Sequence, residues 1–130
     1  MGIDVAALVA AALAARERSY SPYSKFAVGA ALLTSTGEIF TGCNVENCSY
    51  GLTICAERTA ACTAVAAGRH EFTALALALS GGGTPCGACR QFLAEFSPNL
   101  PIYIVDADAP GNVMETSLDV LLPGRFELPA

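Results

Sequence analysis

Two cysteines lie three positions apart in the segment Pro85-Cys86-Gly87-Ala88-Cys89. We expect a helix to begin here, and the positive end of a helix dipole favours the thiolate form of both side chains. Two thiolates at this spacing can bind one metal ion. The same pattern is also typical of a redox-active dithiol and of half a structural zinc knuckle, so the motif by itself leaves the chemistry open.

A second cluster, Cys55-Ala56-Glu57-Arg58, follows a polar loop and opens another expected helix. Residues i and i+2 of a helix point about 200° apart, so Cys55 and Glu57 can face one site only if Cys55 occupies the first helical position. Considered alone, Glu57 is an ordinary acid of a first turn and Cys55 is a small buried side chain. The cluster gains meaning only beside the first one.

Together the two clusters supply three thiolates from two helix starts, which is an incomplete tetrahedral set for zinc. A structural zinc site is closed by four protein ligands, whereas a catalytic site keeps one position open for water. We expect His70 at the surface or at a helix end, and Cys43 and Cys62 in the core, while Cys48 stays open as a fourth ligand. A redox dithiol would make no use of Cys55, and that interpretation ranks third.

The expected secondary structure predicts an α/β fold. Helices are expected over residues 4–18, 55–67, 86–96 and 117–121, and strands over residues 26–34, 38–44, 72–79, 101–106 and 112–116. The first two strands form a hairpin around Ser35-Thr36-Gly37. The later alternation of strands and helices predicts a three-layer α/β/α sandwich with a mixed sheet of about five strands. We expect the 130 residues to form a single domain.

Charge and composition exclude several classes of partner. The formal net charge is −5 and the seven Lys and Arg residues are scattered, so we expect no nucleic-acid partner. The apolar run of residues 5–15 has no cation ahead of it and is too short to span a bilayer. It predicts a helix capped by Asp4, with no membrane partner and a cytoplasmic location. In that compartment six cysteines favour metal binding or catalysis over disulfides.

The helix expected over residues 55–67 consists almost entirely of Ala, Thr, Cys and Val. A helix that is apolar all round is buried on every side, and a single chain of this length has little room for such a helix. The sequence therefore predicts self-association.

Four segments in register give the sequence a family resemblance. The order of the two clusters, C-x-E followed by P-C-x-x-C, resembles the signature of zinc-dependent nucleobase deaminases, in which Cys can replace His as the first ligand. Residues 20–26, 42–47, 55–60 and 85–91 read YSPYSKF, GCNVEN, CAERTA and PCGACRQ, and they resemble cytidine deaminase of the short, homotetrameric class. The resemblance spans nearly the whole chain, from about residue 19 to residue 126, although the loop of residues 80–84 is short beside most members.

The resemblance implies one zinc ion per chain, held by Cys55, Cys86 and Cys89, and hydrolytic deamination of cytidine and 2′-deoxycytidine to uridine or deoxyuridine and ammonia. Hydroxide on the zinc would attack C4 of the base while Glu57 moves the protons. It also implies a homotetramer in which neighbouring subunits complete each site. The residues implied in substrate binding are Phe26, Asn44, Glu46 and Ala56, with Tyr50 and Phe126 reaching across from a neighbour.

Charge balance predicts a role for two arginines. Three thiolates outweigh the charge of Zn²⁺, and a bound hydroxide and an ionised Glu57 add further negative charge, which opposes ionisation of the water. Arg58 lies one turn from Cys55, and Arg90 follows Cys89 directly. We expect both guanidinium groups to offset this charge by donating hydrogen bonds to the thiolates.

Other interpretations of the same residues stay open. The chain could deaminate another aminopyrimidine nucleoside, of the antibiotic type, or a base within a polynucleotide. Asn44 beside Glu46 favours a free ribose, since an amide and a carboxylate suit its hydroxyls, although such a pair also fits a solvent-facing strand end. An alternative from another class is a non-catalytic, zinc-stabilised binding domain, in which Glu57 would be dispensable.

Overall fold

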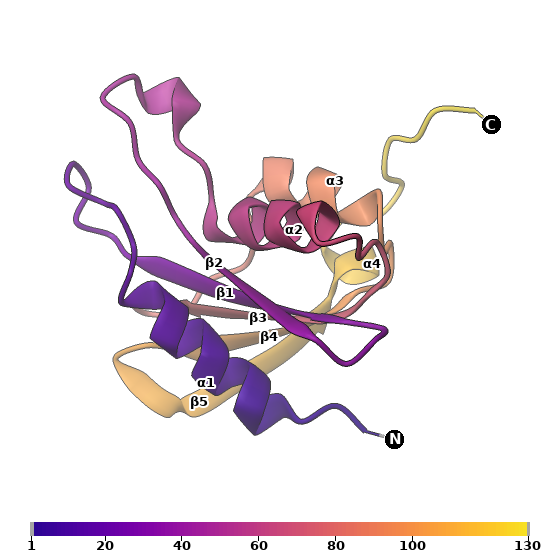
Figure 1. The fold of residues 1–130 in the computed structure, drawn as a ribbon, viewed down its shortest axis with the longest axis horizontal. Helices are drawn as coiled ribbons and strands as arrows, with labels where there is room; N and C mark the ends of the chain where they lie inside the picture. The colour runs from indigo at the N-terminus through magenta and orange to yellow at the C-terminus, as the bar shows by residue number, and fades with distance from the viewer. Residues whose placement is uncertain (1, 130) are drawn as a thin grey trace.

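A computed structural model of the chain describes residues 2–129 (Figure 1). Its elements, in chain order, are α1 (Val5–Arg16), β1 (Val28–Thr34), β2 (Ile39–Cys43), the 3₁₀ helix η1 (Tyr50–Leu52), α2 (Ala56–Ala66), β3 (Phe72–Leu79), α3 (Gly87–Ala94), β4 (Pro101–Asp106), β5 (Ala109–Ser117) and α4 (Leu118–Leu121).

The five strands form one mixed sheet in the order β2-β1-β3-β4-β5. Strands β3 and β4 are parallel, and all other neighbours are antiparallel. A parallel pair needs a crossover connection, and α3 lies in the connection between β3 and β4. The predicted mixed sheet of five strands is therefore confirmed.

Helices cover both faces of the sheet, with α1 on one face and α2 and α3 on the other (Figure 1). The central strand β3 shows why both faces are buried. Its residues Ala74, Ala76 and Ala78 belong to the cluster on the α1 side, whereas Leu75 and Leu77 belong to the cluster under α2 and α3. This alternation follows from the two-residue period of a strand and produces the predicted three layers.

Two glycines allow helices to lie directly on strands. A Cβ atom added at Gly29 in β1 would lie 2.1 Å from the carbonyl oxygen of Ala12 in α1. A Cβ atom added at Gly42 in β2 would lie 2.4 Å from the backbone nitrogen of Ala60 and 2.6 Å from the carbonyl oxygen of Ala56. Any larger residue would therefore push these helices off the sheet, and α2 is the helix that follows Cys55.

Helix α1 begins as expected, because the carboxylate of Asp4 accepts a hydrogen bond from the backbone nitrogen of Ala7 at 3.0 Å. It ends two residues earlier than predicted, at Arg16. None of the helices within residues 2–129 has the length and hydrophobicity needed to cross a membrane.

In the single chain α2 is not buried on every side, so burial all round would require the self-association that the sequence predicts, and that association stays a prediction. One side of α2 packs on the sheet, but Cys62, Thr63 and Ala66 on the other side are exposed. Cys62 is therefore not a core residue, and Cys43, also predicted in the core, is half-buried. Small uncharged side chains look alike in a core and on an exposed helix face, so composition could not separate the two.

Candidate functional site

Three cysteine sulfurs meet where α2 and α3 begin. The Sγ atom of Cys55 lies 3.9 Å from that of Cys86, which lies 3.5 Å from that of Cys89. Cys55 is the N-cap of α2, Cys86 is the N-cap of α3, and Cys89 is fully buried in the first turn of α3. The partial positive charges of two helix N-termini therefore lie beside the thiols and favour thiolates.

The spacing of the sulfurs fits one metal ion. A tetrahedral zinc ion with Zn–S bonds of about 2.3 Å holds its sulfur ligands about 3.8 Å apart. In this cluster all three Sγ atoms lie within 4.8 Å of one another. Within residues 2–129 it is the one group of three or more possible ligands, and neither Cys48 nor His70, both exposed, belongs to it. Three ligands leave one tetrahedral position open.

The protonation of the thiols depends on their mutual contacts. The pKa of Cys55 is lowered to about 5, because Cys89 donates a hydrogen bond to its sulfur and because Arg58 and Cys86 also stabilise the thiolate. The pKa of Cys89 is raised, since this thiol is the donor in that bond and is buried. A metal ion must displace the proton of Cys89 when it binds, so metal affinity depends on pH.

The two arginines differ in what they contact. Arg58 donates from Nη2 to the sulfur of Cys55 at 3.3 Å, and its buried Nε has no hydrogen-bond partner among the described residues. The expectation that Arg90 also donates to the thiolates is wrong. Its Nε and Nη1 donate to the carbonyl oxygens of Pro85 at 2.7 Å and Leu121 at 2.9 Å. The residue after Cys89 points about 100° away from it around the helix, which turns Arg90 toward α4.

Glu57 is a carboxyl group held out of water beside the thiols. It lies in the first turn of α2 and is only 5% exposed. Burial, together with the negative charge of Cys55, raises its pKa. A higher pKa makes a carboxylate a stronger base, which suits a group that accepts a proton and then passes it on. Ala56, which the resemblance implies as a substrate contact, is fully buried, and that role stays a prediction.

Asn44, expected to bind the ribose, is used within the chain. Its Oδ1 accepts hydrogen bonds from the backbone nitrogen of Val28 at 3.0 Å and from the hydroxyl of Ser19, and its Nδ2 donates to the carbonyl oxygen of Phe26 at 2.8 Å. Asn44 thereby fastens the loop that precedes β1 to the end of β2. The side chain of Phe26 is exposed at the end of this loop.

Glu46, the second residue expected at the ribose, points toward the same loop. Its carboxylate accepts hydrogen bonds from the backbone nitrogens of Tyr23 at 3.0 Å and Ser24 at 3.1 Å, and from the Ser24 hydroxyl. The Ser24 hydroxyl is the main cause of the lowered pKa of Glu46. With Tyr50 and Thr53 these residues line a cavity of about 190 Å³.

Sequence reasoning gave no role to Tyr23, Ser24 or Thr53 in this cavity. Tyr23 and Ser24 belong to the YSPYSKF segment, so the resemblance held a signal for them, whereas Thr53 carried none. Tyr50, expected to reach a neighbouring subunit, is 73% exposed, and its ring lies edge-on to that of Tyr23 with a centroid distance of 5.9 Å.

Phe126 lies apart from these residues in the single chain. The C-terminal segment leaves α4 and runs outward past the end of α3 (Figure 1). The ring of Phe126 is 69% exposed and lines a different hollow from Glu46, together with Gln91 and Glu95. The expected role of Phe126 at a neighbouring subunit's site stays a prediction.

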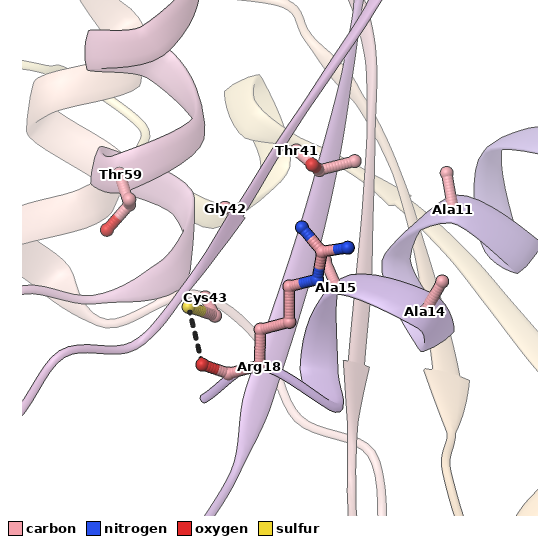
Figure 2. A pocket seen from close by; sticks show the side chains of 8 residues that line it. All are labelled: Ala11, Ala14, Ala15, Arg18, Thr41, Gly42, Cys43 and Thr59. Carbon is pink, nitrogen blue, oxygen red and sulfur yellow. Dashed lines mark hydrogen bonds between the residues drawn. The ribbon is translucent and has the colours of Figure 1, made fainter. Parts of the chain in front are cut away.

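A further hollow of about 490 Å³ lies between α1, β2 and α2 (Figure 2). It is lined mostly by small side chains, namely Ala11, Ala14, Ala15, Arg18, Thr41, Gly42, Cys43 and Thr59. Among the described residues that line it there is no acid and no group of possible metal ligands. It adjoins the exposed side of α2, since the half-buried Thr59 that lines it lies one helical turn before the exposed Thr63.

Comparisons with known proteins agree with this geometry. Residues 4–104 match the family described as the cytidine and deoxycytidylate deaminase zinc-binding region. A cytidine deaminase from Sporosarcina psychrophila is 49% identical over 127 residues, which are 95% of this chain and 92% of that relative. The crystal structure of cytidine deaminase from Burkholderia pseudomallei has a TM-score of 0.89 and 49% identity, and the match covers 95% of this chain and 100% of that one. Cytidine deaminase from Mycobacterium tuberculosis matches with a TM-score of 0.83 and 41% identity, covering 98% and 100% of the two chains.

Proposed function

The chain belongs to the family of zinc-binding cytidine and deoxycytidylate deaminases, and from this premise we propose that it hydrolyses cytidine and 2′-deoxycytidine to uridine or deoxyuridine and ammonia. One observation carries the proposal. Three thiols can hold a metal ion with one position left open, and one of them, Cys55, directly precedes the helix whose first turn holds the buried Glu57. The names of the relatives support cytidine as the substrate.

The sulfurs of Cys55, Cys86 and Cys89 would hold the zinc ion, which supplies the Lewis acidity that makes water nucleophilic at neutral pH. The side chains of this chain do the remaining work. Arg58 keeps a positive charge against the Cys55 sulfur and so limits the negative charge that collects there. The burial of Cys89 and Glu57 keeps bulk water away from the inner side of the cluster.

Glu57 would move two protons during one turnover. As the water oxygen bonds to C4 of the base, Glu57 accepts the first water proton and delivers it to N3. It then takes the second proton from the new hydroxyl group and gives it to the amino group, which leaves as ammonia when the C4–N bond breaks. A raised pKa suits both roles, because the carboxyl must release each proton that it takes.

We propose that Glu46 and Phe26 hold the nucleoside beside this centre. The cavity at Glu46 is open to solvent-exposed side chains, and a carboxylate accepts hydrogen bonds from sugar hydroxyls. Asn44 supports them by fixing the loop that ends at Phe26. Comparing cytidine with 2′-deoxycytidine under the same conditions would show how much the 2′-hydroxyl contributes.

We further propose that the working unit is a cytoplasmic homotetramer in which Phe126 and Tyr50 of one chain reach the site of another. Their exposure, and the small side chains exposed along α2 and in the adjoining hollow, support an interface between copies. All six cysteines are free, which suits a reducing compartment. Light scattering at assay concentration tests the assembly, and a fully active monomer would contradict it.

The decisive experiment follows the ultraviolet absorbance of cytidine after addition of the zinc-loaded protein. We expect turnover that a chelator abolishes, and a loss of about 10²–10⁴-fold or more in Glu57→Gln with zinc retained. The matched control is Glu71→Gln, which makes the same substitution at an exposed residue. No turnover of cytidine by a zinc-loaded chain would favour the binding-domain alternative, and turnover of a different aminopyrimidine nucleoside alone would change the substrate.

A further inference from the structure

The C-terminal segment has very few attachments to the rest of the molecule. Beyond α4, the single described hydrogen bond that ties residues 123–129 to the fold runs from Nε2 of Gln91 to the carbonyl oxygen of Phe126, at 2.9 Å. The ion pair between Arg125 and Glu127 lies within the segment and fixes nothing outside it. The direction in which Phe126 points therefore depends on one side chain of α3.

Arg90, the residue of α3 that precedes Gln91, holds the point where the same segment begins. Arg90 donates from Nη1 to the carbonyl oxygen of Leu121, the last residue of α4, at 2.9 Å. Its other nitrogens donate to the carbonyl oxygen of Pro85 at 2.7 Å and to the hydroxyl of Thr84 at 2.9 Å. One guanidinium group thus links the strand-to-helix loop before Cys86 to the point where the C-terminal segment starts.

We propose that Arg90 and Gln91 are positioning residues that hold the C-terminal segment on the metal-ligand helix α3, Arg90 at its base and Gln91 at Phe126. The two side chains are adjacent in sequence and follow Cys89 directly, so the helix that supplies two metal ligands also sets the position of Phe126. The consequence for catalysis rests on the proposed function, in which Phe126 reaches a substrate. The attachment of the C-terminal segment to α3 does not depend on that function.

Digestion with trypsin can measure how firmly the C-terminal segment is held on α3, without any measurement of turnover. Arg125 precedes Phe126, so cleavage there removes residues 126–130, which mass spectrometry detects directly. The zinc-loaded protein is digested as the parent, as Gln91→Met and as Glu95→Met. Methionine keeps the length and helix propensity of glutamine but has no donor. Glu95 lines the same hollow and makes no described hydrogen bond to the segment, so it is the matched control. Cleavage at the exposed Lys25 in the same digest normalises the protease.

We expect Gln91→Met to speed cleavage at Arg125 about three- to ten-fold relative to Lys25, because the rate follows the fraction of time that the segment is released. Glu95→Met should match the parent. The chain has no tryptophan, so Phe126→Trp provides a second readout, and adding Gln91→Met should increase acrylamide quenching of that single indole. Equal cleavage and equal quenching with and without Gln91 would overturn the proposal. If Gln91→Met is cleaved faster but the parent turns over no cytidine, the attachment of the segment by Gln91 is supported and only the proposed function is refuted.

Discussion

Replacing Gly42 by alanine should disturb both stability and catalysis through a displacement of α2. The added methyl group would lie 2.4 Å from the backbone nitrogen of Ala60, and ordinary contact begins at 3.4 Å, so the helix must move by about 1 Å. The atoms in the way belong to the backbone and cannot rotate aside. Forcing a group into a packed interior typically costs about 1–3 kcal/mol of unfolding free energy.

The same displacement would separate the two halves of the site. Cys55 and Glu57 move with α2, whereas Cys86 and Cys89 remain at the start of α3. A misplacement of about 1 Å in a catalytic constellation can reduce the rate about 10²-fold. We therefore expect Gly42→Ala to lose zinc more readily and to turn over cytidine about 10²-fold more slowly per folded chain.

The control is Gly111→Ala in β5, where an added Cβ atom meets nothing within 4 Å. Urea unfolding at one fixed protein concentration measures stability, and turnover per bound zinc measures the site. If Gly42→Ala matched Gly111→Ala in both measurements, α2 could not rest on β2 as closely as described.

Three further predictions concern single side chains. Cys86→Ala should reduce bound zinc to well below one ion per chain in metal analysis, because two thiolates remain, whereas Cys48→Ala should keep full occupancy. Arg58→Gln should raise the pKa of Cys55, since the guanidinium stabilises its thiolate, so release of zinc to a colorimetric chelator on acidification should begin at a higher pH than in the parent. The carboxylate of Asp106 accepts hydrogen bonds from backbone N–H groups, and these lower its pKa. The contribution of Asp106 to stability is therefore fully present above the usual pKa of 3.8 and is lost as the pH falls through the lower pKa of the folded state. Asp106→Asn should therefore lower the urea midpoint at neutral pH, and the difference from the parent should vanish in strong acid.

The extent to which the sequence predicted the fold varied from strand to strand. The expected ranges 72–79 and 101–106 coincide with β3 and β4, because both are continuous apolar runs that are buried on two faces. Strand β5 runs from Ala109 to Ser117, well beyond the expected 112–116, since most of it is exposed at the sheet edge and carries no apolar pattern. Its pairing with β4, which only the tertiary structure reveals, defines its length.

The sequence likewise predicted some features of the candidate site and not others. The meeting of the Cys55, Cys86 and Cys89 sulfurs was predicted from two expected helix starts together with the resemblance to zinc-dependent deaminases, because the spacing alone left the chemistry open. The contacts of Arg90 could not be predicted, since they depend on where α4 returns to α3. Likewise, nothing in the sequence indicates that the amide of Asn44 is already used by the loop before β1.

The metal cluster also has a consequence for the chain as a polymer. Cys55 and Cys86 are 31 residues apart in sequence, yet their sulfurs lie 3.9 Å apart, so an ion that joins them closes a loop containing all of α2 and β3. A covalent cross-link around a loop of this size removes enough freedom from the unfolded chain to stabilise the native state by about 3–4 kcal/mol. A tightly bound ion that joins the same residues restricts the chain in the same manner. Stripping the metal should therefore free the segment between Cys55 and Cys86 as well as abolish catalysis, and the apo chain should unfold more easily even where no catalytic residue has changed.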